Sequence, residues 1–123
     1  MIFSYQQEIH RQFQIYAPLI LERNFSFAHD PDIGVTFLKG WVIFIDYSVL
    51  EFAEKYSSRS HRYRFHYMTS KKAMVVRWDN VPHHKKIPTF PHHKHTPKGV
   101  ESSKDMNLVD TLKHIITNFL PEK

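Results

Sequence analysis

The chain has 123 residues, of which 41% are hydrophobic and 15% aromatic, enough for a single domain over residues 1–123 with a sizeable core. No apolar run approaches the roughly 20 residues of a membrane span, and the N-terminus lacks the layout of a signal peptide, so we expect a cytoplasmic protein with no membrane partner. The absence of cysteine excludes disulfides and thiolate metal sites. A formal net charge of +5 favours an anionic partner without specifying one.

The apolar pattern predicts a helix, five strands and a second helix. The first helix covers residues 2–16 and is expected to end there, because Pro18 disfavours helical backbone in the residue before it. Strands are expected at residues 19–28, 35–45, 49–56, 61–68 and 73–79, with Gly40 as a candidate bulge, and the last helix within residues 105–119, capped by Asp105 or Asn107.

Short connections between the predicted strands indicate a mainly antiparallel sheet, and both helices are expected to cover one of its faces. The predicted fold class is therefore α+β: a two-layer sandwich of a five-stranded sheet with N-terminal and C-terminal helices, and a His/Pro-rich loop before the last helix.

Strict alternation marks the strand "HRYRFHYM" at residues 61–68. His61, Tyr63, Phe65 and Tyr67 project to one face of the sheet, and the residues between them project to the other. The second face therefore carries Arg62, Arg64 and His66.

The segment "NVPHHKKIPTFPHHKH" at residues 80–95 holds five of the ten histidines. Prolines at 82, 88, 91 and 97 forbid a helix and disfavour a central strand, so the segment is predicted to be an extended loop over the domain. We expect it to lie beside Arg62, Arg64 and His66.

Imidazoles beside a cationic strand suit chemistry on phosphate, because arginine binds phosphate oxygens and histidine transfers protons near neutral pH. RNA cleavage without a metal needs a base, an acid and a cation, and hence no cofactor. The candidate catalytic residues are His66, His83, His84, His92, His93, His95, Arg64 and Arg77, and the candidate nucleic-acid-binding residues are Arg62, Lys85, Lys86 and Lys94.

Simpler interpretations compete with this hypothesis. Alternating Arg and His residues on a strand are often only a solvated face, and Asp79 and Asn80 are ordinary turn formers. Zinc also accepts imidazole ligands, and Asp79 is the nearest carboxylate, but the spacing matches no common zinc motif and no metal ligand is assigned.

Three motifs resemble the toxins of TumE-type toxin–antitoxin systems: "RYRFHYM" at 62–68, "RWDNVPHH" at 77–84 and "TFPHHKH" at 89–95. The pattern of Asp46, Ser48, Leu50 and Phe52, with Glu54 downstream, fits the same layout. Tyr47 departs from it, because such sequences usually carry glycine there.

This resemblance implies a prokaryotic cytoplasmic toxin restrained by a cognate antitoxin protein, but it does not supply a reaction. Three hypotheses stay open: a toxin acting as a metal-independent ribonuclease, a non-enzymatic inhibitor that binds RNA or the ribosome, and a histidine-rich metal-binding module. A homo-oligomer is also left open.

Overall fold

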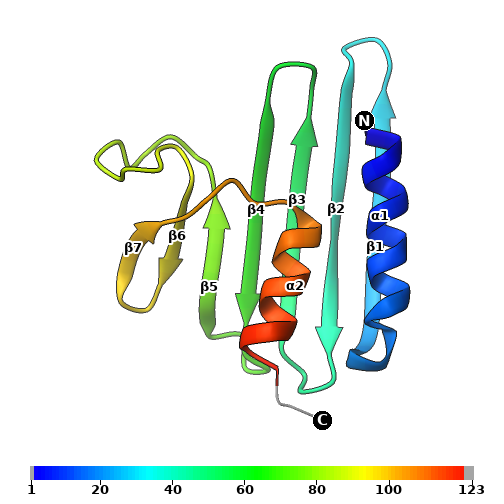
Figure 1. Cartoon of the computed structure of the whole chain (residues 1–123), viewed down its shortest axis with the longest axis vertical. Coiled ribbons are helices and arrows are strands. Elements are labelled where there is room, and N and C mark those ends of the chain that lie inside the picture. The colour runs from blue at the N-terminus through cyan, green and yellow to red at the C-terminus, as the bar shows by residue number, and fades with distance from the viewer. Residues whose placement is uncertain (1, 121–123) are drawn as a thin grey trace.

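A computed structural model describes residues 2–120 and shows one antiparallel sheet with both helices packed on the same face (Figure 1). The α+β class and the one-sided placement of the helices agree with the prediction. The elements are α1 (Ile2–Ile15), a 3-10 turn (Ala17–Leu19), β1 (Ile20–Asp30), β2 (Val35–Phe44), β3 (Val49–Tyr56), β4 (His61–Met68), β5 (Met74–Asp79), β6 (His93–Thr96), β7 (Gly99–Ser102) and α2 (Leu108–Asn118).

The sheet has seven strands, so the prediction of five was wrong. Their order in space is their order in the chain, and each strand pairs antiparallel with the next. The first five strands lie close to their predicted positions. The two additional strands, β6 and β7, lie in or just after the segment that was predicted to be a loop.

Prolines lie on either side of β6 and do not prevent it from forming. Pro91 precedes the strand, and Pro97 lies in the turn between β6 and β7, where a proline removes no ladder hydrogen bond. Gly99 follows with φ +128°, a backbone conformation that favours glycine. Strand β6 therefore forms between two prolines that we interpreted as evidence against a central strand.

The part of the histidine segment that remains a loop is also not extended. Successive backbone hydrogen bonds from His83 to Val81, Ile87 to His84, Phe90 to Ile87 and His92 to Thr89 fold it into a chain of turns. This compact excursion connects β5 to β6 and brings His84 back toward the sheet.

The core lies between the helices and the sheet. Ile9 and Phe13 of α1 and Leu108, Leu112 and Ile115 of α2 are fully buried against it. Asn107 caps α2 by accepting the Asp110 N–H at 2.8 Å, so the predicted capping residue is Asn107 and not Asp105. Within residues 2–120, no helix is both long and apolar enough to cross a membrane.

Two local features of the sheet correct or explain the sequence pattern. Gly40 is paired in regular register and forms no bulge, but a Cβ there would lie 2.0 Å from the Asn24 carbonyl oxygen. The irregular pairing lies between Ile20 and Glu22 instead. Tyr47 has φ +66°, so the turn does require the conformation that glycine adopts most easily.

Candidate active site

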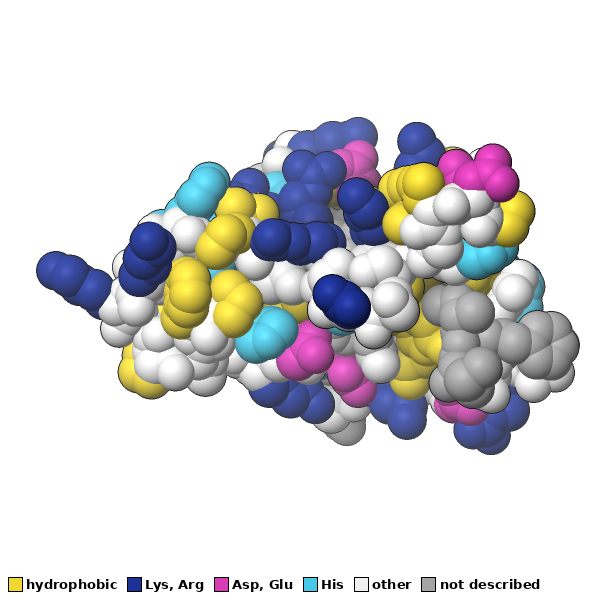
Figure 2. Space-filling model, turned by 90° about the horizontal axis from the view of Figure 1, so that it is seen from above, with side chains coloured by type: hydrophobic (Ala, Val, Ile, Leu, Met, Phe, Trp, Pro, Cys, Tyr) yellow, Lys and Arg dark blue, Asp and Glu magenta, His cyan; other side chains and the backbone are white. Residues whose placement is uncertain are grey.

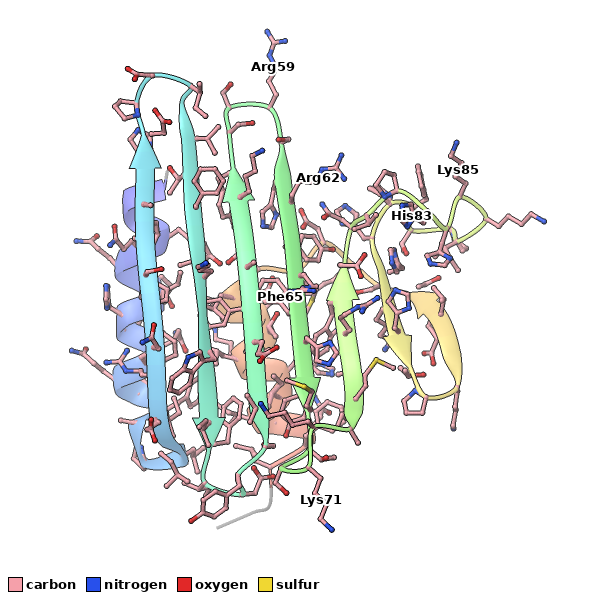
Figure 3. All side chains as sticks on the ribbon, turned by 180° about the vertical axis from the view of Figure 1, so that it is seen from behind. Arg59, Arg62, Phe65, Lys71, His83 and Lys85 are labelled. Carbon is pink, nitrogen blue, oxygen red and sulfur yellow. The ribbon has the colours of Figure 1, made fainter. Side chains whose placement is uncertain are left out.

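Two rows of paired residues cross the face of the sheet that the helices leave uncovered (Figure 3). One row places Arg77 of β5 between His66 of β4 and His95 of β6. The neighbouring row contains Arg64, Asp79 and His93 in the same strand order. Residues directly opposite one another in antiparallel strands project to one face, so all six side chains share this open face.

Asp79 lies at the centre of this group with only 4% of its surface exposed. Its Oδ1 lies 2.9 Å from His93 Nε2, and its Oδ2 lies 3.5 Å from His95 Nε2 and 3.4 Å from Arg77 Nε. Oδ1 also accepts the Val81 N–H, as expected of a turn former. Asp79 therefore has the predicted turn role, and the same carboxylate also lies beside two histidines, which no local pattern indicates.

The loop adds a third imidazole. The ring of His84 lies 4.8 Å from that of His93 and 5.5 Å from that of His95, measured between centroids, and the rings of His93 and His95 are 4.9 Å apart. We call His84, His93 and His95, together with Asp79, the histidine cluster.

Burial and a neighbouring cation lower the pKa of two histidines of the open face. The pKa of His66 is lowered mainly by burial and then by Arg77, against an opposing effect of Glu51. The pKa of His95 is likewise lowered by burial and then by Arg77, although Asp79 opposes it. A neutral imidazole can accept a proton, so both residues are suited to general-base chemistry in the free protein.

Arg77 lies between these two histidines with a free donor. Its Nε is buried and has no hydrogen-bond partner among the described residues, since its contact with Asp79 is an ion pair at 3.4 Å without bonding geometry. A buried N–H without a partner costs free energy, which an anionic ligand at this position would recover.

A basic groove runs from this site toward β2. Its cavity of about 270 Å³ has Phe37, Ala53 and Val81 among its apolar lining residues. Seen from above, several lysine and arginine side chains lie close together along one edge of the molecule, and others lie on the remaining edges (Figure 2). The cations that line the groove are Lys39, Lys55, Arg62 and Arg64.

Comparison with protein families decides what kind of protein carries this site. A family model described as Toxin TumE matches residues 11–122. The chain belongs to the TumE toxin family. The predicted resemblance is thereby confirmed, and membership identifies the chain as the toxin component of a toxin–antitoxin system with an antitoxin as its partner. No curated protein and no solved structure matches the chain.

The three motifs through which the chain resembles TumE toxins meet at the open face. The first supplies Arg64 and His66, the second Arg77, Asp79 and His84, and the third supplies His93 and His95. Segments up to 31 residues apart in the sequence of this TumE protein are therefore brought together by strand pairing.

Several predicted residues lie elsewhere. His83, Lys85 and Lys86 are exposed on the loop, away from the paired rows (Figure 3). His92 lies on the helix-covered side, where its Nδ1 is 2.8 Å from the Tyr63 hydroxyl. Lys94 also projects to that side and faces Glu101 at 3.9 Å.

Sequence reasoning missed a second polar cluster, on the helix-covered side of the sheet. Glu54 is 3% exposed and accepts hydrogen bonds from Tyr5, from Tyr56 at 2.7 Å and from His61 at 2.7 Å. Tyr5 in turn accepts the Leu108 N–H at the start of α2, so this network joins both helices to the sheet. Tyr56 and His61 were predictable as neighbours from the β3–β4 hairpin, whereas Tyr5 lies 49 residues from Glu54.

Proposed function

We propose that this TumE toxin acts in the cytoplasm on RNA, as a ribonuclease that needs no metal ion. The observation that carries the proposal is the row of His66, Arg77 and His95 on the open face. Strands are spaced about 4.8 Å apart, so the backbones of the two histidines lie roughly 10 Å apart with the guanidinium between them. That arrangement allows two imidazoles to approach one phosphate from opposite sides.

The roles follow from the partners of each histidine. His66 has no carboxylate bonded to its ring, and it takes the proton of the RNA 2′-hydroxyl as that oxygen attacks phosphorus. Asp79 opposes the effects of burial and Arg77 that lower the pKa of His95. Once a bound phosphate has raised that pKa and the ring has taken up a proton, His95 gives the proton to the departing 5′-oxygen. One P–O bond forms and one breaks, leaving a 2′,3′-cyclic phosphate and a 5′-hydroxyl.

Cations supply the remaining requirement. Arg77, whose side chain is 34% exposed, offers its guanidinium to the phosphate, and Arg64 lies one row away. Negative charge grows on the non-bridging oxygens in the transition state, so donors already fixed toward that position stabilise it most. A bound phosphate also raises the pKa of His95, which prepares that residue as an acid. His93 is 2% exposed and serves to position Asp79.

Incubation of untagged protein with cellular RNA, with and without a chelator, tests the proposal. We expect cleavage in both conditions, products that end in a cyclic phosphate, and a rate at least about a hundredfold lower in His66→Ala and His95→Ala. His10→Ala is the matched control, because His10 is exposed on α1, beneath the other face of the sheet. Intact RNA in both conditions, from a preparation that is toxic in cells, would overturn the proposal.

The basic groove favours a second candidate function, in which the toxin binds RNA or the ribosome and blocks it without cleavage. Lys39, Lys55, Arg62 and Arg64 would then supply salt-sensitive affinity. Under this alternative, toxicity in cells survives His66→Ala and His95→Ala but is lost when Arg62 and Arg64 are both replaced by alanine. Lys94, which lies on the other side of the sheet, would contribute little.

A further inference from the structure

The histidine cluster has more ring nitrogens than its hydrogen bonds can explain. One ring nitrogen from each of His84, His93 and His95 lies within 4.8 Å of the others. We propose that this cluster binds one divalent transition-metal ion of the zinc type, with Asp79 as the fourth ligand, and that the bound ion holds the toxin inactive. The inhibitory part of this inference rests on the proposed function, whereas metal binding does not.

His93 provides the first argument, because its hydrogen bonds fix its tautomer. Its Nδ1 lies 2.9 Å from the carbonyl oxygen of Pro91, which can only accept, so Nδ1 carries the proton. The Nε2 of the neutral ring then carries the lone pair, and it lies 2.9 Å from Asp79 Oδ1. Two acceptors at that distance need a cation between them, either a proton or a metal ion.

A metal ion satisfies the whole cluster, whereas a proton satisfies only one pair. His95 turns its Nε2 toward the other oxygen of Asp79, and His84 approaches both rings from the loop. A backbone carbonyl that holds the far nitrogen of a histidine, as Pro91 does for His93, is also the usual support of a metal ligand.

The cluster is wider than a closed tetrahedral site. Zinc binds imidazole nitrogen and carboxylate oxygen at about 2.0–2.2 Å, which puts neighbouring ligand atoms roughly 3.3 Å apart. The three imidazole nitrogens lie within 4.8 Å of one another, and the two oxygens of Asp79 lie 2.9 Å from His93 Nε2 and 3.5 Å from His95 Nε2. Metal binding therefore has to draw the imidazoles closer together, and His84 can follow because it comes from the loop.

A metal ion in the histidine cluster would stop the proposed reaction for a chemical reason. It occupies the lone pair of His95, so that residue can no longer carry a proton to the 5′-oxygen. It also ties the loop to the open face through His84, beside Arg77. Metal removal would then release the toxin activity.

Calorimetric titration of chelator-treated, untagged protein with zinc chloride tests binding, and the visible absorption of the cobalt(II) form tests tetrahedral geometry. We expect one ion per chain, and affinity at least about tenfold weaker in His84→Ala and in Asp79→Asn. His83→Ala is the matched control, because His83 is the chain neighbour of His84 but is exposed and outside the cluster. Far-UV circular dichroism of each variant shows whether it is folded.

A stoichiometry well below one ion per chain, or unchanged affinity in folded His84→Ala, would overturn the metal site. If wild-type protein cleaves RNA, one equivalent of zinc is expected to abolish cleavage and a chelator to restore it. Cleavage that zinc leaves unchanged or accelerates would refute the inhibition while leaving the metal site in place. A protein that binds one ion but never cleaves RNA would overturn the proposed function alone.

Discussion

The side chain of Asn80 is hydrogen-bonded to the backbone of β4 on both sides of Arg62: its Oδ1 accepts the Tyr63 N–H at 3.0 Å, and its Nδ2 donates to the His61 carbonyl at 2.6 Å. These bonds extend the pairing of β4 by one step after β5 has ended at Asp79. They fix the point at which the chain leaves the sheet to form the loop that carries His84. The position of the loop therefore depends on one amide side chain.

Asn80→Ala is expected to lower the free energy of unfolding by about 2 kcal/mol, because it leaves a buried donor and acceptor of β4 unsatisfied. Denaturant titration measures this loss. Asn24→Ala, at an exposed position of β1, is the control and is expected to change stability by less than about 0.5 kcal/mol. Equal stabilities of the two variants would show that the amide does not hold the loop.

The charges around His66 predict two opposite shifts of its titration. Arg77→Gln removes a positive charge that disfavours protonation, so the pKa of His66 rises. Glu51→Gln removes the negative charge opposite His66, so its pKa falls further below the usual range. Titration of the His66 ring signal by NMR measures both shifts, and shifts of the same sign would contradict this account.

The shifts in the pKa of His66 also predict how the pH dependence of RNA cleavage changes. Because His66 acts as a base in the proposed reaction, cleavage is lost as pH falls through the pKa of His66 and is present above it. In Glu51→Gln, the acidic limb of the rate profile is therefore expected to move to lower pH. Activity that is lost at the same pH in Glu51→Gln and in wild type would remove His66 from the role of base.

The basic groove predicts how RNA affinity depends on salt. Replacement of Lys39 and Lys55 by alanine removes two cations of the groove while leaving His66, Arg77 and His95 in place. For single-stranded RNA, each lost phosphate contact lowers the slope of log affinity against log salt by about 0.7, so we expect a decrease of roughly 1.4. Filter binding at several salt concentrations measures the slope.

Lys94→Ala is the control for this experiment, because Lys94 projects to the helix-covered side. Its slope is expected to equal that of the wild type. If Lys94→Ala lowered the slope more than the double variant does, RNA would bind the helix-covered face and not the open face that we propose.

Tyr47 predicts a stabilising substitution. It is 65% exposed and has φ +66°, so glycine relieves the backbone without removing a buried side chain. We expect Tyr47→Gly to raise the free energy of unfolding by roughly 0.5–1 kcal/mol, net of the entropy that glycine loses on folding. Tyr47→Ala keeps the Cβ and is expected to gain nothing, so thermal unfolding of the two variants separates backbone relief from loss of the aromatic ring.

The elements with a complete local pattern were predictable from sequence. The last helix shows apolar residues at helical spacing after a capping asparagine, and β4 shows strict alternation, so both lie where the pattern placed them. The hairpin of β6 and β7 was missed because prolines lie before β6 and in the turn after it, and a local rule about proline does not distinguish a strand between two prolines from a loop.

The sequence predicted which residues could belong to the site, but not which of them lie together. Arg64, His66, Arg77 and the pair His93 and His95 meet because of strand register, which local patterns do not reveal across 11 residues or more. His92 and His93 differ only by alternation: one faces Tyr63 on the helix-covered side and the other faces Asp79 on the open face. If β6 had been predicted as a strand, its alternation would have assigned His92 and His93 to opposite faces of the sheet.

The order of the strands has a consequence for when this toxin becomes dangerous to the cell that makes it. Each strand pairs with the one synthesised just before it, so the sheet can grow in step with translation, and every closure it needs is short. The row of His66, Arg77 and His95 is nevertheless incomplete until β6 has emerged, and the part of the sheet beneath α2 stays uncovered until that helix follows. Under the proposed function, a chain that ends before β6 lacks the acid His95, so activity is expected only after nearly the whole chain has been made.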